Sequence, residues 1–231
     1  MDQAFTLLSQ WGGNLVVGAI NTVLISLCAY GLGFILGLSG AVGKLSGGPI
    51  VRGVLNVYTT LVRSLPELLL IVILYYLGTQ TINNLLATYE MSITINGFIA
   101  ASIVLGFVSG AYQTEVLRGA IQAIPIGQIE AGMAYGMSPA LRFRRIVLPA
   151  MLPHAIPGMS NLWLNITKDS ALVGVVGYAE LTLQTRQAAG GTKWYFTFYL
   201  ASMALYLAIS LVSLWFFRRL ESRVRVGQAR V

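Results

Sequence analysis

The sequence has few of the residue types on which soluble enzymes depend. Charged residues make up only 10% of its 231 residues, and it contains one histidine and one cysteine. A soluble domain usually carries about a quarter charged residues. A single cysteine excludes a disulfide framework and a cysteine-based metal site. Hydrophobic residues reach 56%, and this excess predicts a protein whose solvent is largely the lipid bilayer.

Motifs for nucleotide binding and catalysis are also absent from the sequence. The only Gly-Lys pair, Gly43-Lys44, has Leu38 where a P-loop needs its first glycine and Leu45 where it needs Ser or Thr. No nucleophile, base and orienting group occur together in a known motif. We therefore expect no enzyme activity and no cofactor in this chain, and a membrane-embedded enzyme is the weakest alternative.

Positive charge is present in excess, with 15 Lys and Arg against 8 Asp and Glu. These basic residues cluster at the ends of apolar segments rather than along one polar face, which argues against nucleic acid as a partner. About 20 helical residues cross the hydrocarbon core. Five segments approach or exceed that length, namely residues 14–42, 65–82, 98–117, 150–167 and 196–217.

The distribution of Lys and Arg between these segments predicts their orientation. The N-terminal tail and residues 83–97 carry none, whereas residues 43–54, residues 118–149 and the C-terminal tail carry two, four and five. We therefore expect an all-α membrane protein with five transmembrane helices, the N-terminus outside and the C-terminus in the cytoplasm. Three basic residues depart from this alternation, namely Lys168, Arg186 and Lys193.

Local signals refine the expected helices. Ser64 and Glu67 have capping-box spacing with Pro66 between them, which predicts a helix starting at Ser64 and a separate interfacial segment before it. Pro153 and Pro157 predict a kink in the fourth span. Residues 171–177 are too short to cross the membrane and predict a non-spanning or re-entrant piece packed against protein.

The loop between the third and fourth spans has a pattern of its own. Residues 130–149 follow the order E-A-x(4)-G-x(9)-I-x-L-P. A break around Gly136, with Ser138 as N-cap and Pro139 at the next position, predicts two short helices, IGQIEAGMAY and PALRFRRIVL. We expect them to form a rigid knob whose apolar contact surface is supplied by Met133, Met137 and Phe143.

This pattern resembles the EAA loop of the permease subunits of ABC importers, which docks into a groove on a cytoplasmic ATPase subunit and transmits its closure. The chain departs from the family at Gly132, where a second alanine is usual. The positive-inside rule is the alternative explanation of the arginines, but it does not account for the full spacing. The resemblance implies a coupling loop made of Glu130, Ala131, Gly132, Met133, Gly136, Met137, Arg142 and Arg145.

Residues 58–70, 110–131 and 157–173 are similar to the polar amino acid branch of these permeases, and within it to the HisQ-type subunits of basic amino acid or opine uptake. The resemblance implies a type I importer permease fold over residues 13–217, a basic cytoplasmic tail over 218–231, and a bacterial inner membrane. The partners that it implies are a second, homologous permease subunit, two ABC ATPase subunits that hold ATP and Mg, a periplasmic substrate-binding protein and the lipid bilayer.

Charged and polar residues inside the apolar runs mark a candidate substrate path, because a charge at bilayer depth must be paired or must face a wet cavity. A cationic amino acid needs a carboxylate for its side chain, and donors or a helix N-terminus for its own carboxylate. The candidates for the first role are Asn161, Asn165 and Asp169, and those for the second are Ser64 and the helix start through Glu67. The list of substrate-path candidates also includes Arg63 and Leu162. Leu162 occupies a position where similar permeases often have an acidic residue.

The sequence thus predicts a permease subunit that imports polar, basic amino acids or opines, of the histidine, arginine, lysine or octopine type, by ATPase-driven alternating access. The alternative is a secondary transporter or channel without an ATPase partner, which usually carries internal repeats; the sequence shows none. Gly33-x3-Gly37 and Gly106-x3-Gly110 predict close helix packing within the fold rather than a dimer interface.

Overall fold

The computed structural model describes residues 2–88 and 96–224, and its regular structure over these ranges is entirely helical. In chain order the elements are α1 (Asp2–Ser46), α2 (Pro49–Ser64), α3 (Glu67–Thr88), α4 (Gly97–Gln122), α5 (Ile126–Ala134), α6 (Pro139–Arg142), the π-helical turn η1 (Phe143–Val147), α7 (Leu148–Val173), the 3₁₀ turn η2 (Gly174–Val176), α8 (Leu181–Thr192) and α9 (Tyr195–Val224).

Four helices in the described ranges are long and apolar enough to span a membrane, namely α1, α3, α4 and α9. The fifth expected span, α7, has 26 residues but is less apolar, because it carries Asn161, Asn165, Lys168 and Asp169. It packs against α4, α1 and α9. α9 runs unbroken to Val224, so the expected basic tail begins as helix, and residues 225–231 lie outside the described residues.

The centre of the fold is the seam between α1 and α4, where glycines let the two helices approach closely. A Cβ added to Gly37 would lie 2.6 Å from the Cβ of Gln113, and one added to Gly33 would lie 2.7 Å from its Nε2. In the opposite direction, Gly106 and Gly110 receive the side chains of Leu32 and Leu36. The expectation that both glycine pairs pack within the fold is therefore confirmed.

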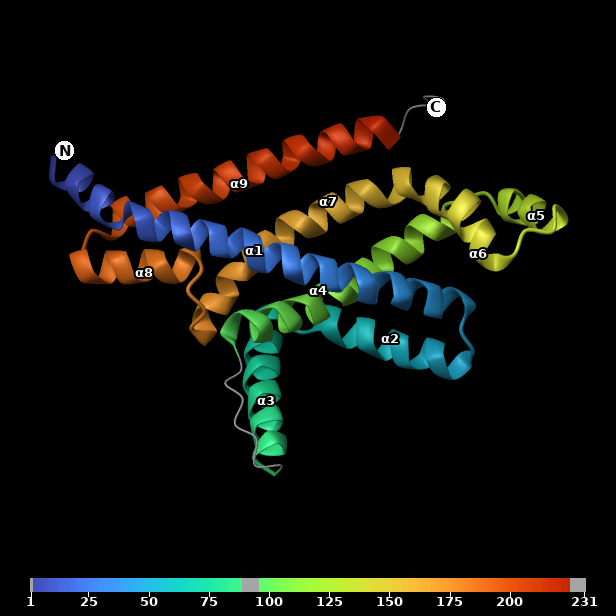
Figure 1. Cartoon of the computed structure of the whole chain (residues 1–231), viewed down its shortest axis with the longest axis horizontal. Helices are drawn as coiled ribbons and strands as arrows, with labels where there is room; N and C mark the ends of the chain where they lie inside the picture. Colours follow the sequence, from blue (N-terminus) through green and yellow to red (C-terminus); the bar gives the residue numbers. More distant parts are fainter. Residues whose placement is uncertain (1, 89–95, 225–231) are drawn as a thin grey trace.

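Most of the segments that carry Lys and Arg lie at one end of the molecule (Figure 1), whereas Arg186 lies in α8 and Lys193 directly follows it. That end holds the C-terminal ends of α1, α4 and α9, the start of α2, and the short helices α5 and α6, whereas the N-terminus and α8 lie at the other end. By the positive-inside rule the first end is cytoplasmic. Figure 1 also shows α3 projecting steeply away from the other helices, and Leu69, Ile73 and Leu77 on it are at least half exposed.

The helix break near Pro66 was predicted, but the assignment of Ser64 as the cap was wrong. Ser64 is the last residue of α2, and α3 begins at Glu67. The N–H of Leu70 donates to the carbonyl of Pro66, which puts Pro66 rather than Ser64 at the helix boundary. The physical reason is that proline disfavours the helical conformation of the residue before it, here Leu65, whose backbone is extended.

Two predictions around the fourth span also need correction. α7 continues through Pro153 and Pro157 and ends at Val173, so residues 171–177 do not form a separate re-entrant piece. They do pack against protein without spanning, as the other alternative predicted, because Val173 and Val176 are buried. The second loop helix is not separate either, because α6, η1 and α7 follow one another without a break. The π turn lies immediately before Pro149, and there the N–H of Leu148 bonds to the carbonyl of Phe143. Proline clashes with the carbonyl four residues earlier, and the widened turn relieves that clash.

The sequence did not predict α8, which lies across the outer end of α1 and beside α9. The side chain of Asn21 donates to the carbonyl of Ala179, and the Thr22 hydroxyl accepts from the N–H of Leu181. Arg186 donates to the carbonyl of Gly174 at 2.8 Å. One of the three basic residues that departed from the expected charge alternation thus has a local structural role.

Candidate functional site

A left-handed turn at Gly136 ends α5 and sets the geometry of the predicted coupling loop. Gly136 has φ +70°. The N–H of Met137 bonds to the carbonyl of Gly132, and the N–H of Gly136 to that of Met133, which together form a Schellman cap. The second helix then starts as predicted, with the Ser138 hydroxyl accepting from the N–H of Leu141 at 3.4 Å.

The departure from the family pattern at Gly132 coincides with a close contact. Gly132 is buried, and a Cβ there would lie 2.6 Å from Cδ1 of Ile146 and 3.3 Å from Cγ of Arg142. Ile146 therefore packs directly on the α5 backbone, which ties the first loop helix to η1. An alanine would displace only the flexible tip of Ile146.

The outer surface of the loop carries apolar and charged side chains that no other described residue covers. Glu130, Ala131 and Arg145 are exposed, Met133 is 50% exposed, and Met137 and Arg142 are half-buried. Phe143 is only partly buried, because one side of its ring packs on the buried cluster that contains Met151. Tyr135, which sequence reasoning missed, is 85% exposed at the tip.

A second candidate site is a small cavity among α3, α4 and α7, with a volume of about 30 Å³. Four of the predicted substrate-path residues line it, namely Glu67, Leu162, Asn165 and Asp169. The carboxylates of Glu67 and Asp169 are close enough to interact electrostatically, and Glu67 also interacts with the Tyr112 hydroxyl. The cavity thus contains two carboxylates and no cation in its lining.

The other three substrate-path candidates lie outside this cavity. Asn161 is exposed on α7, and Ser64 is exposed at the end of α2. The guanidinium of Arg63 lies over the ring of Tyr112 at 5.9 Å, a cation–π distance, so Arg63 borders the cavity through that ring. Sequence reasoning missed Tyr112 and Ser109, which line the cavity from α4; their spacing of one helical turn was the available signal.

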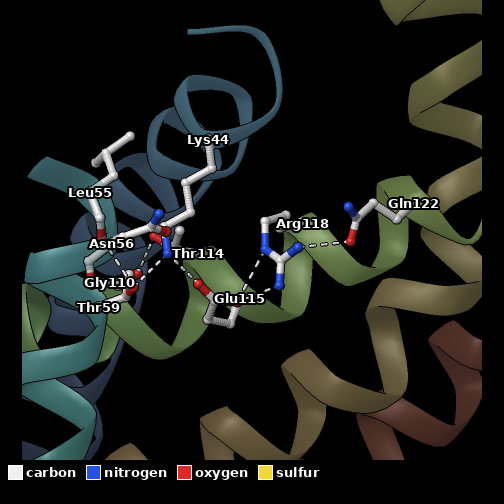
Figure 2. Close-up of polar contacts among 9 residues, drawn as sticks. All are labelled: Lys44, Leu55, Asn56, Thr59, Gly110, Thr114, Glu115, Arg118 and Gln122. Atoms are coloured by element: carbon white, nitrogen blue, oxygen red, sulfur yellow. Dashed lines mark hydrogen bonds and ion pairs between the residues drawn. The ribbon is translucent and has the colours of Figure 1, made fainter. Parts of the chain in front are cut away.

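A charge network lies beside this cavity at the cytoplasmic ends of α1 and α4 (Figure 2). Glu115 accepts from Lys44 at 2.6 Å and from Arg118 at 2.8 Å. Lys44 also donates to the Thr59 hydroxyl of α2, and Arg118 donates to Gln122. Glu115 and Arg118 thus form a pair near the helix end, and Lys44 ties three helices together.

At the opposite end Glu180 caps α8, and its side chain is fully buried. Its two carboxylate oxygens accept from the N–H groups of Thr182 and Leu183, each at 2.7 Å. Tyr206 on α9 also donates to the Glu180 carboxylate. Burial raises the pKa of Glu180 above its ordinary value, although these hydrogen bonds act to lower that pKa. Glu180 therefore joins α8 to α9 at the outer end.

Comparison with known proteins agrees with this architecture. The family described as "Binding-protein-dependent transport system inner membrane component" matches residues 13–226. The octopine transport system permease protein OccQ of Rhizobium radiobacter is 39% identical over 222 residues, which cover 95% of this chain and 94% of that protein. The histidine/lysine/arginine/ornithine transport system permease protein HisQ of Escherichia coli is 36% identical, over 97% of this chain and 99% of that protein.

A solved structure described as an amino acid ABC transporter with histidines is similar to this chain with a TM-score of 0.77 and 28% identity. The match covers 94% of this chain and 96% of that one. The fold is thus that of a type I ABC importer permease, as the sequence predicted. The chain belongs to the family of inner membrane components of binding-protein-dependent transport systems, and it is a multi-pass protein of the bacterial inner membrane.

Proposed function

We propose that this chain is the permease subunit of an ABC importer for cationic amino acids or opines. The observation that carries the substrate class is the pairing of Glu67 and Asp169 at a cavity whose lining contains no cation. Two carboxylates so close together repel each other unless a cation or a proton lies between them. The basic group of an arginine, a histidine or an opine supplies that positive charge. The names of the relatives support the same class.

The small size of the cavity also supports the proposal that a second permease subunit is needed to form the transport path. A volume of about 30 Å³ holds one or two waters, so this cavity as one chain forms it has no room for an amino acid. Asn161 and Asn165 are exposed on the same face of α7 as Asp169, and α3 projects from the bundle without cover. A second, homologous permease packed against these surfaces would complete the path.

The coupling loop supports separate ATPase partners. Its Schellman turn and the contact between Gly132 and Ile146 make α5, η1 and α7 move as one unit. The ATPase would bind the exposed surface around Glu130 and Met133 differently in its open and closed states. This difference would move α7 and so change the side of the membrane from which substrate can reach the path. ATP and Mg are then bound on the partner chains, and a periplasmic binding protein delivers the substrate.

The test is uptake by proteoliposomes that contain this chain together with a candidate partner permease, ATPase and binding protein from the same organism. We expect ATP inside the vesicles to drive arginine, histidine or opine accumulation, and ADP to support none. Glutamate and leucine serve as acidic and neutral controls and should compete weakly. ATP-independent accumulation would instead identify a secondary transporter, and preferential uptake of glutamate would contradict the substrate class.

A further inference from the structure

A polar pocket extends along α2 from the cytoplasmic end of the molecule toward the candidate substrate cavity. This basic pocket has a volume of about 420 Å³ and is lined by polar and charged residues of α1, α2 and α4. Arg52 and Arg63 both line it, and the helical rise from one to the other is about 16 Å. The guanidinium of Arg63 lies over the ring of Tyr112, which lines the cavity. The basic pocket and the cavity therefore meet at this pair of side chains.

The inner end of the basic pocket lies deep in the molecule, because α2 packs alongside α1 and α4. The Tyr58 hydroxyl donates to the carbonyl of Phe107, and Val62 packs in one cluster with Val108. These contacts fall in the middle of α4. Arg63 follows Val62 directly, so it lies near half the depth of the bilayer, where a charged side chain needs a partner or water. The polar lining of the basic pocket supplies such a surrounding.

The network of Figure 2 holds the walls of the basic pocket together. Lys44 is only 7% exposed and donates to Glu115 of α4 and to the Thr59 hydroxyl of α2. Arg118 bonds the other oxygen of the Glu115 carboxylate. Among the described residues that line the pocket, Glu115 is the only carboxylate. A basic group that passes through the pocket therefore meets no unpaired carboxylate that would retain it.

The charges of the cavity and of the basic pocket follow one another in a fixed order. The cavity contains the carboxylates of Glu67 and Asp169, whereas four cations line the basic pocket. Within the described ranges neither Arg52 nor Arg63 forms an ion pair with a carboxylate. A basic amino acid or an opine carries both a basic group and a carboxylate. Its basic group suits the cavity, and its carboxylate suits the basic pocket.

We propose that the basic pocket is the cytoplasmic half of the substrate path, and that the substrate leaves through it with its carboxylate leading. This proposal rests on the proposed function, because it takes the carboxylate pair of the cavity as the site of the basic group. The cations of the pocket attract the leading carboxylate and repel the basic group that follows. The same repulsion disfavours the return of a cationic substrate from the cytoplasm.

The test is the reactivity of introduced cysteines in the reconstituted complex toward membrane-impermeant methanethiosulfonates added at the cytoplasmic face. Thr60 lines the pocket, about 12 Å along α2 from Arg52. Leu61 is 55% exposed at the same depth but does not line the pocket. Both variants also carry Cys28→Ser, because Cys28 is exposed. Without nucleotide, Thr60→Cys should react at least about tenfold faster than Leu61→Cys, since a thiolate does not form among acyl chains.

The charge of the reagent tests the direction in which the substrate leaves. Relative to free cysteine, Thr60→Cys should react roughly fivefold faster with an anionic than with a cationic methanethiosulfonate, because of the cations around it. A preference for the cationic reagent would overturn the carboxylate-first exit. Trapping the ATPases with ATP and vanadate should slow the reaction of Thr60→Cys. Equal rates in both states, or equal rates at Thr60→Cys and Leu61→Cys, would show that the pocket is no part of an alternating path.

This labelling is measured without substrate, so its result does not depend on the substrate class. ATP-driven uptake by the unlabelled complex tests that class separately. Cationic uptake without labelling of Thr60→Cys would overturn the exit route and leave the proposed function standing. Labelling as expected in a complex that prefers glutamate would overturn the proposed function and leave the route standing.

Discussion

At the scale of single residues, Gly136 decides how the chain leaves α5. Its φ of +70° lies in the left-handed region, which costs an L-residue with a Cβ about 1–2 kcal/mol. The cap that it completes directs α6 back toward α5, and Ile146 then packs on Gly132. The position of the coupling surface thus depends on one backbone conformation.

We therefore expect Gly136→Val to uncouple transport from ATP hydrolysis. A β-branched residue disfavours the turn and displaces α5 relative to α7, so substrate-stimulated ATPase activity of the reconstituted complex should fall about tenfold. Membrane insertion, measured in the same preparation, should remain normal. Gly136→Asn is the matched control, because asparagine tolerates the left-handed conformation, and it should keep most of the activity. Wild-type uptake by the valine variant would count against the docking role.

Asp169 is the residue on which the preference for cationic substrates depends in this account. Asp169→Asn keeps the shape of the side chain and removes its charge beside Glu67. A hydrogen bond to a charged group contributes about 1.5–3 kcal/mol, so the KM for arginine should rise tenfold or more. Uptake of a neutral analogue such as citrulline should change about twofold at most.

The control for this experiment is Lys193→Gln, which alters an exposed basic residue that does not line the cavity. It should leave the ratio of the two KM values unchanged. If Asp169→Asn weakens the charged and the neutral substrate equally, the carboxylate serves the packing of α7 and not the recognition of charge.

At the scale of helices, the α1–α4 seam holds the fold together through glycine. Gly37→Ala brings a Cβ to 2.6 Å from the Cβ of Gln113 and 3.0 Å from its backbone. Overpacking of this kind costs about 1–3 kcal/mol, so the Tm of the purified transporter should fall by several degrees.

The same helix provides a matched control for that substitution. Gly31 has no atom within 4 Å of an added Cβ, so Gly31→Ala should leave the Tm unchanged or raise it, since alanine favours a helix by about 1 kcal/mol over glycine. Equal destabilisation by both substitutions would mean that the loss does not come from the seam.

Several helices could be predicted because their signals are local or strongly periodic. Apolar length located the spans, and Gly136, Ser138 and Pro139 located the loop helices. α8 was missed because its composition is nearly balanced between polar and apolar residues, and because its cap is Glu180, an uncommon N-cap residue. Its position depends on contacts with α1 and α9, which no local pattern records.

The residues of the candidate site could be predicted in part, but their arrangement in space could not. Glu67, Asn165 and Asp169 could be selected because charge and amide groups are rare within apolar runs. Their meeting with Tyr112 in one cavity could not be predicted, because it depends on how α3, α4 and α7 pack. Lys44 is a similar case, since its partner Glu115 lies 71 positions away in the sequence.

At the scale of the whole molecule, the outer end and the cytoplasmic end differ in structure. The outer end is fixed by α8, with Glu180 bonded to Tyr206 of α9. The cytoplasmic end presents the coupling loop and the basic pocket beside α2. In the proposed function, the exposed apolar side of α3 and the small cavity belong to an incomplete path, which partner subunits around this chain would complete.

The most direct test of this account is site-specific crosslinking from the tip of the coupling loop in intact membranes. A photo-reactive amino acid in place of Tyr135, which is 85% exposed, should crosslink to a chain that carries a P-loop and binds ATP. The same group in place of Gln187, exposed on α8 at the outer end, should not reach that chain. Crosslinks to the ATPase from position 187, or accessibility of position 135 only from the periplasm, would contradict the central claim that a separate cytoplasmic motor drives this permease.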